Sequence, residues 1–335
     1  MDPNDRSLVG FTMMGHGIFH SYELAIPIFV IEWLDVFQVS PAFLGLIVGL
    51  GYGGIGIGAL PSGILADRFD AKRLIILSIA GMGGGFLLLS VAPNVYLIGG
   101  GIVIWGLAAS VYHPVGLSLI SRAAKQRGPV FAYHGVGGNI GTVLGPVIAA
   151  SFLIFFDWRI VIVLLVIPSV AGVLLGTTID VEERVREEAT APSTGNPRSG
   201  TDEGAESGVS EQESEGAPAT TIRSLIADSR TLFTASFGVV FVVVLAYGMY
   251  YRGLLTFLPE VLAALPQFHP VSILDRTVEP GQYVYSGLLT VGIFGQYIGG
   301  RVTDSIRAEY ALLATFLALA ILSLLFLPAA AFGTI

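Results

Sequence analysis

Nine long apolar segments make up most of this 335-residue chain and restrict what it can fold into. Each holds about 20 mainly apolar residues, the length that an α-helix needs to cross a bilayer. Only 13% of the residues are charged, against roughly 25% in soluble domains. We therefore expect an all-α polytopic membrane protein. The approximate spans are 9–31, 43–66, 74–92, 95–120, 129–155, 159–179, 232–258, 282–302 and 310–331.

The basic residues predict how these spans are oriented. With the N-terminus inside, cytoplasmic segments collect 14 of the 17 Lys and Arg residues, and the external loops hold only Arg159 and Arg276. Cytoplasmic loops of membrane proteins carry such an excess of positive charge. We therefore expect a multi-pass protein of the cell inner (cytoplasmic) membrane with a cytoplasmic N-terminus.

A polar segment separates the first six spans from the last three. Residues 180–222 are rich in Glu, Ser, Thr, Gly and Pro, a composition typical of disordered linkers. The expected organisation is a six-helix N-terminal bundle over 1–179, an acidic cytoplasmic linker over 180–222, and a partial, three-helix C-terminal half over 223–335. The absence of cysteine excludes disulfides and thiolate metal sites.

Two loops between apolar spans share the pattern Gly-x-x-x-Asp. The first, GILADRFDAKR, starts at Gly63, and the second, GRVTD, starts at Gly300. The first loop resembles Gly-x-Leu-Ala-Asp-Arg-x-Gly-Arg-Arg, between helices 2 and 3 of the major facilitator superfamily, with Asp70 and Ala71 replacing the usual glycine and first arginine. The resemblance implies the major facilitator fold and a gating-loop motif made of Gly63, Asp67, Arg68, Lys72, Arg73, Gly300 and Asp304.

The resemblance also implies that about three helices are missing. Members of that superfamily usually have twelve helices in two six-helix halves, and here the second half stops after its third helix. A C-terminally incomplete fragment, a natural truncation and a bundle completed by a second copy all remain open.

Polar residues in the first span form one candidate site. His16, His20 and Glu23 are spaced i, i+4 and i+7, which places them on one helix face. Ionisable residues inside a membrane usually face the protein interior or a water-filled cavity, and such groups can carry protons. The alternative is that they only tie this helix to its neighbours by hydrogen bonds. The His-x-x-x-His pair suits a metal, but without further ligands we predict no metal site and no cofactor.

The fourth and fifth spans carry SVYHPVG and FAYHGVGGNIGTVLGP, in which His113 and His134 should lie in the cytoplasmic half and can approach each other. Both segments resemble the fosmidomycin-resistance branch of the superfamily, which exports drugs against protons. The second segment also resembles the antiporter motif of helix 5, matched by Gly141, Gly145 and Pro146. The alternative is a glycine-packed helix interface. Asn139, near the middle of this span, either bonds a substrate or cross-links helices.

Arg252 is the sole base predicted deep within a span. An intramembrane arginine needs an acid or an anionic ligand, so Glu23 is its expected partner. The alternative is that its side chain snorkels to the external surface. Gln296 and Tyr297 are expected to add polar groups to a central cavity.

No enzyme motif competes with this interpretation. The sequence has no Gly-x-Ser-x-Gly elbow, Walker loop or His-Glu-x-x-His helix. We expect a secondary active transporter that moves a small organic molecule by alternating access, with proton-coupled efflux as an antiporter. The alternatives are proton-coupled uptake of an organic anion, and a truncated, non-transporting membrane sensor or assembly protein. Expected partners are the lipid bilayer, the small-molecule substrate and protons, with no nucleic acid, and either a second copy or the missing C-terminal helices.

Overall fold

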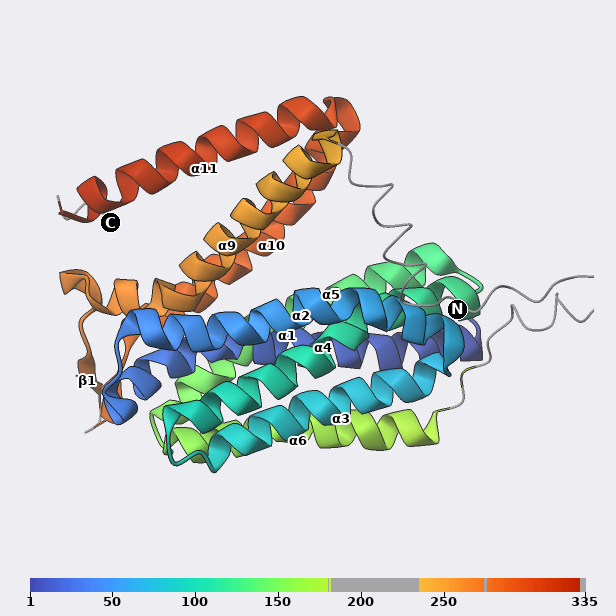
Figure 1. The fold of residues 1–335 in the computed structure, drawn as a ribbon, viewed down its shortest axis with the longest axis horizontal. Helices are drawn as coiled ribbons and strands as arrows, with labels where there is room; N and C mark the ends of the chain where they lie inside the picture. Colours follow the sequence, from blue (N-terminus) through green and yellow to red (C-terminus); the bar gives the residue numbers. More distant parts are fainter. Residues whose placement is uncertain (180, 182–234, 274–275, 332–335) are drawn as a thin grey trace, which may run out of the picture. The chain divides into compact units, whose positions relative to one another are not determined.

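The computed structural model describes residues 1–179, 181, 235–273 and 276–331, and helices dominate them (Figure 1). Most of the predicted acidic linker, 180–222, lies outside these residues. The elements are, in chain order, α1 (Pro3–Phe37), α2 (Pro41–Arg68), α3 (Ala71–Ser90), α4 (Val95–Ala123), α5 (Arg127–Leu153), α6 (Trp158–Thr178), α9 (Ala235–Ala263), the 3-10 helix η1 (Pro266–Phe268), β1 (Val271–Ile273), β2 (Arg276–Val278), α10 (Pro280–Ser305) and α11 (Ala308–Ala331).

The chain forms two compact units. One comprises Met1–Val185 with Gly253–Ile335, and the other is Arg186–Arg252. The bundle α1–α6 lies wholly in the first unit, and the boundary falls inside α9. Arg252 therefore belongs to the second unit.

Most of the helices that the sequence predicts have the apolar length that a membrane requires. Within the described residues, seven helices are long and apolar enough to cross a bilayer: α1 to α6 and the part of α9 from Gly238 to Ala263. The described apolar part of α11, Tyr310–Phe326, is shorter than a full span. The predicted span 282–302 is helical within α10 but does not reach that apolarity in its described residues. The residues at 296–297 and 299–305 of this helix are not among those whose side chains the structure describes.

Short polar side chains determine where the bundle helices begin. The Asp2 carboxylate accepts the N–H of Asp5 at 2.9 Å, and the Asn94 side chain accepts that of Leu97 at 3.0 Å. Each bond satisfies one of the backbone donors that a helix leaves open in its first turn. The Asp2 cap makes α1 begin at Pro3, six residues before the predicted span.

The first turn of α1 is held by a buried carboxylate that the sequence analysis did not single out. Asp5 has no exposed surface and accepts the N–H groups of Lys125 at 2.9 Å and Gln126 at 3.1 Å. The Asn4 side chain donates to the Ala123 carbonyl at 3.2 Å, and Lys125 forms an ion pair with Asp2. These contacts tie the start of α1 to the connection between α4 and α5.

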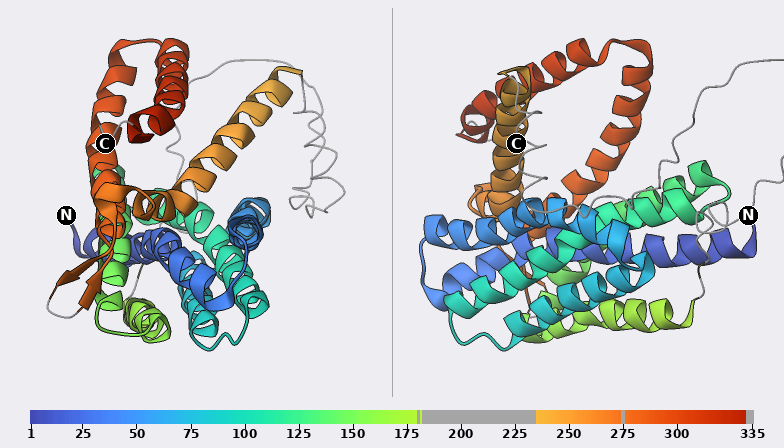
Figure 2. Two further views of the ribbon diagram at one scale, coloured as in Figure 1. Left: turned by 90° about the vertical axis from the view of Figure 1, so that its left-hand side faces the viewer. Right: turned by 45° about the vertical axis from the view of Figure 1, so that its right-hand side comes forward.

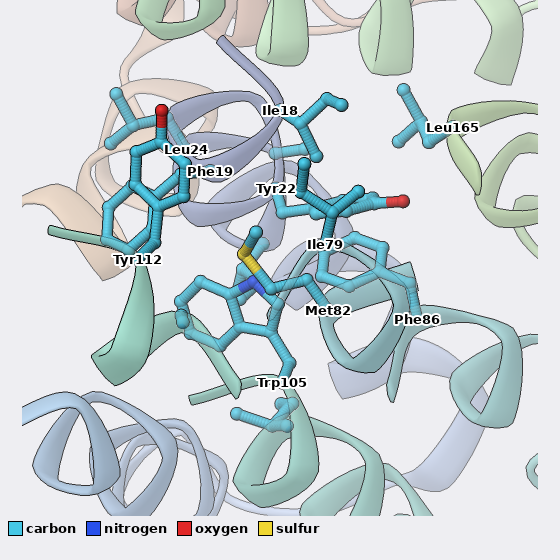
Figure 3. Packing of buried hydrophobic residues seen from close by; sticks show 14 of the residues in the cluster. Ile18, Phe19, Tyr22, Leu24, Ile79, Met82, Phe86, Trp105, Tyr112 and Leu165 are labelled. Atoms are coloured by element: carbon cyan, nitrogen blue, oxygen red, sulfur yellow. The ribbon is translucent and has the colours of Figure 1, made fainter. Parts of the chain in front are cut away.

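The six helices α1–α6 lie side by side as a bundle (Figure 2). The helix α1 packs mainly on α5, with further contacts to α4 and α6, while α3 packs against both α4 and α6, and α2 against α4. Large side chains fill the interior, where the rings of Tyr22 and Phe86 lie 3.9 Å apart between centroids (Figure 3). Trp105 and Met82 lie beside them with no exposed surface.

A short hairpin precedes α10. The strands β1 and β2 pair antiparallel, with Val271 opposite Val278 and Ile273 opposite Arg276. The sequence analysis treated this stretch only as an external loop.

Candidate functional site

A continuous chain of polar contacts runs along one face of α1. The Nδ1 atom of His20 lies 2.7 Å from Oε2 of Glu23, and Nε2 of His20 lies 3.1 Å from Nε2 of His16. The Nδ1 atom of His16 lies 2.8 Å from the backbone carbonyl oxygen of His134 on α5. The one-face spacing of these side chains thus becomes a hydrogen-bonded chain that ends on a second helix.

Two further histidines from other helices complete the cluster. The ring of His134, from α5, stacks on His16 with centroids 4.0 Å apart, and His113, from α4, meets His16 edge-on at 5.0 Å. Phe19 packs against His113 at 4.4 Å. The sequence treated His113 and His134 as a pair separate from α1, whereas the structure places both on His16.

The cluster is enclosed on several sides. Glu23 is buried with 3% of its side chain exposed, whereas 25% of the His20 side chain is exposed. The Tyr112 hydroxyl donates to the carbonyl of Thr12, and the Tyr52 hydroxyl donates to the carbonyl of Glu23 at 2.9 Å. The sequence analysis passed over both tyrosines, although Tyr112 directly precedes His113.

Glycines on α5 allow α1 to come close enough for these contacts. A Cβ atom at Gly137 or Gly141 would overlap backbone atoms of α1, at Met13 and Gly17 respectively. A Cβ atom at Gly138 would approach the His16 ring to 2.5 Å. The glycines of α5 therefore form the surface on which α1 packs.

The predicted motif on α5 continues this contact. A Cβ atom at Gly145 would overlap the backbone of Ser21, and Pro146 is buried beside it. Asn139 is half-buried on the same helix and does not take part in the histidine contacts above.

The residues of the first predicted gating loop lie at helix ends. Asp67 and Arg68 are exposed at the end of α2, and the Asp70 carboxylate accepts the N–H of Arg73 at 2.7 Å as the cap of α3. Lys72 donates to the carbonyl of Ile179, just beyond α6. Gly63 lies within α2, where a Cβ atom would meet nothing within 4 Å.

Arg122 supplies a contact to this loop that the sequence analysis missed. Its guanidinium donates to the Ala66 carbonyl at 3.3 and 3.4 Å, near the end of α2. A cation at a helix C-terminus stabilises the exposed carbonyls and the negative end of the helix dipole.

The remaining predicted site residues lie in the C-terminal helices. Arg252 belongs to α9 in the second unit, where its guanidinium lies 5.6 Å from the Tyr251 ring centroid. Gln296, Tyr297, Gly300 and Asp304 fall in α10, and their side chains are outside the described residues.

Three of the imidazoles form a geometric candidate for a metal site. One ring nitrogen each of His16, His20 and His113 lies within 4.8 Å of the others. The sequence offered only the His16–His20 pair, because nothing in it placed His113 next to α1.

A bundle of bilayer-length apolar helices around a buried carboxylate–histidine chain defines a polytopic membrane protein of the transporter class. The chain belongs to the Major Facilitator Superfamily, which matches residues 11–335. Members of this family are membrane transporters and not enzymes.

The chain is similar to several known transporters and resistance proteins, including the following three. A triacylglyceride transporter of Mycolicibacterium hassiacum is 30% identical over 163 residues, 47% of this chain and 29% of that protein. A multidrug resistance protein B homolog of Mycobacterium tuberculosis is 33% identical over 100 residues, 29% of this chain and 18% of that protein. A Na(+), Li(+), K(+)/H(+) antiporter of Planococcus maritimus is 31% identical over 121 residues, 34% of this chain and 28% of that protein. Each match therefore spans less than a third of the relative.

The fold is similar to a solved structure of the same type. A bacterial homolog of the human lysosomal transporter Spinster, in an inward-facing, unoccupied conformation, has a TM-score of 0.59 and 17% sequence identity. The similarity covers 92% of this chain and 64% of that one. It supports the fold alone.

Proposed function

We propose that this protein is a secondary transporter that exports a small organic molecule from the cell in exchange for protons, by alternating access. The observation that carries the proposal is the buried Glu23–His20–His16 chain inside the bundle of a Major Facilitator Superfamily member. A charge is costly inside a membrane, at about 2.5–3.5 kcal/mol on insertion scales, and intramembrane acids and histidines mark ion pathways. The relatives named as a multidrug resistance protein and as a cation/H(+) antiporter favour the same direction and coupling.

Each candidate residue has a role in this proposal. Glu23 carries the proton, with His16 and His20 as its hydrogen-bonded partners. His113, His134 and Asn139 are further candidates for handling protons or substrate, Arg252 pairs with Glu23, and Gln296 and Tyr297 add polar groups to a central cavity. The loops at Asp67 and Asp304 act as gates, and the α5 glycine motif sets the packing of α1.

Proteoliposomes test the function directly. The full chain is reconstituted with the pH dye pyranine trapped inside, and ethidium, a lipophilic organic cation, is added outside. We expect ethidium to drive protons out of the vesicles in exchange for its entry, because antiport links opposite movements of the two. Vesicles that show no proton movement with ethidium or with a panel of uncharged lipophilic drugs would contradict drug/proton exchange.

Proton-coupled uptake of an organic anion is the second candidate, favoured by Arg252 in α9. In the same vesicles an organic anion would then drive protons in its own direction of movement. Protons that follow an added anion such as benzoate, in excess of its passive entry into protein-free vesicles, would favour uptake over export.

The proposed topology places the N-terminus, the linker 180–222 and the loops at Asp67 and Asp304 on the cytoplasmic side of the inner membrane. We expect a single cysteine introduced at Ser207 to resist a membrane-impermeant maleimide in intact cells. One introduced at Ser272, in the 260–280 loop, should react with it. The natural chain has no cysteine, so the unchanged protein is the blank. Labelling of position 207 from outside would reverse the topology.

The proposed pairing of ionised Glu23 with Arg252 across the two halves predicts a coupled effect. Each single change, Glu23→Gln or Arg252→Gln, leaves the other charge without its partner inside the membrane. The double change should therefore recover protein level relative to either single change, without recovering proton coupling. Membrane protein levels from the four versions measure the coupling, and strictly additive losses would show that the residues act independently.

A further inference from the structure

The contacts along α1 fix where the hydrogens of the histidines lie. A backbone carbonyl can only accept a hydrogen bond, so Nδ1 of His16 carries a hydrogen and donates it to His134. The contact between Nε2 of His16 and Nε2 of His20, at 3.1 Å, needs one hydrogen between two nitrogens. The contact between Nδ1 of His20 and the Glu23 carboxyl group, at 2.7 Å, needs a third.

Counting these hydrogens gives the charge of the group. Two neutral imidazoles bring one ring hydrogen each, and an ionised carboxylate brings none, so the three contacts need one proton more. That proton makes either Glu23 a neutral acid or one imidazole a cation beside the carboxylate. In both arrangements the net charge of the three side chains is zero, the form that a membrane interior favours.

We propose that His16, His20 and Glu23 bind a single proton as one unit, and that the structure shows the proton-loaded form of this unit. The proposal deepens the proposed proton coupling and rests on it for its role in transport. Loss of the proton leaves two hydrogens for three contacts, so one of the two contacts of His20, with His16 at 3.1 Å or with Glu23 at 2.7 Å, must open. Unloading is thereby linked to a movement of the His20 ring.

The same geometry indicates where the proton enters. The chain is closed at His16, because the His134 carbonyl that follows it cannot pass a proton on. Glu23 is buried at the other end, and His20 is the member with the more exposed side chain, at 25% against 3% for Glu23. The proton therefore enters and leaves at His20, and the Glu23 carboxylate balances its positive charge.

The groups around the unit come from three other helices. His113 and Tyr112 on α4 and His134 on α5 pack against the His16 ring, and the Tyr52 hydroxyl on α2 bonds the Glu23 carbonyl. The two tyrosines and the two histidines carry no charge in their neutral forms. A proton on His113 or His134 would repel a proton on His16. The cluster thus favours one proton over two.

A metal ion is the competing occupant of the same nitrogens. Ligands bound to zinc at about 2.0–2.1 Å lie at most about 4.2 Å apart. The three imidazole nitrogens lie within 4.8 Å of one another, whereas the His16–His20 pair is at hydrogen-bond distance, 3.1 Å. A shared proton fits the observed pair without any rearrangement, and His113 is not needed for it.

Nitrogen NMR of the full chain labelled with ¹⁵N-histidine tests the proposal, because ring nitrogens with and without hydrogen differ widely in shift. The protein is purified without a histidine tag and treated with a chelator. We expect His16 and His20, assigned with His16→Gln and His20→Gln, to lose the shared proton together, at one midpoint, as the pH rises. In Glu23→Gln the shared proton should be missing at the pH where the natural protein holds it, and His269→Gln in the external loop should change nothing in the pair.

Three results would overturn the proposal: separate midpoints for His16 and His20 in the unchanged protein, a His16 signal insensitive to Glu23→Gln, or joint movement of His16, His20 and His113 on adding one equivalent of Zn²⁺. The first is read without any variant, so a misfolded substitution does not block the test. No substrate is involved. If NMR shows the shared proton but ethidium drives no proton movement in proteoliposomes, the result counts against the proposed export and not against the shared proton.

Discussion

Replacing Glu23 by glutamine is expected to abolish proton-driven ethidium transport while leaving ethidium exchange intact. Glutamine has nearly the same volume and still offers a hydrogen-bond partner to His20, but it cannot gain or lose a proton. When substrate is present on both sides of the membrane, the carrier changes conformation with substrate bound in each direction and needs no proton. Exchange should therefore survive. Proteoliposomes measure both rates: ethidium accumulation driven by an inside-acid pH gradient, and exchange of external ethidium for ethidium trapped inside.

The matched control for this change is Asp35→Asn. Asp35 is an exposed acid near the end of the same helix, so its neutralisation should leave both rates as they are. Unchanged pH-driven accumulation in Glu23→Gln would reduce Glu23 to a structural role. Loss of exchange as well would indicate that the substitution damages the whole transporter.

The second large effect is expected from Gly141→Val in the seam between α5 and α1. Its side chain would occupy the space of the Gly17 backbone, so neither a rotamer change nor a small side-chain shift relieves the overlap. Overpacking in a well-packed interior costs about 1–3 kcal/mol and occasionally more, and backbone contact places this site at the upper end. We expect a clear drop in the melting temperature of the detergent-purified protein and a lower yield of monodisperse material.

Gly135→Val provides the comparison on the same helix. A Cβ atom there meets nothing within 4 Å, while the substitution makes the same change in helix propensity. Similar melting temperatures for the two variants would mean that α1 and α5 are not in backbone contact in the folded protein.

Contacts within a single helix could be predicted from the sequence. The spacing of His16, His20 and Glu23 follows the 3.6-residue turn, which alone brings each side chain to the next. The same applies to the bundle helices, whose apolar lengths were evident. Their exact starts were not, because α1 begins at Pro3, directly after the Asp2 cap, and the polar first turn that follows the cap is not part of the apolar pattern.

Contacts between helices could not be derived in the same way. The glycines of α5 indicated that some helix packs closely, but any of several neighbours would have satisfied them. His134 and His113 both contact His16 because α1 is the helix that packs on the glycines of α5, in one particular register along the helix axis. A single sequence shows neither the partner helix nor the register. Asp5 was missed for a related reason: an acid outside the apolar span is ordinarily solvated, and its two backbone partners come from a loop 120 residues away.

The Asp70 substitution in the gating loop illustrates a different limit. Asp70 differs from the family pattern, which usually has glycine at this position. In the structure it caps α3, a role that its position directly before the helix allows and that the motif comparison concealed.

The buried Asp5 carboxylate gives the histidine-bearing helices a common pivot. It joins the start of α1 to the connection between α4 and α5, so these three helices are held together at this end. With a rise of 1.5 Å per residue, His16 lies about 17 Å from Asp5 along α1 and Glu23 about 27 Å. A tilt of α1 about this pivot therefore displaces Glu23 about 1.6 times as far as His16. The contact of His16 with α5 is therefore disturbed less by such a tilt than the surroundings of Glu23.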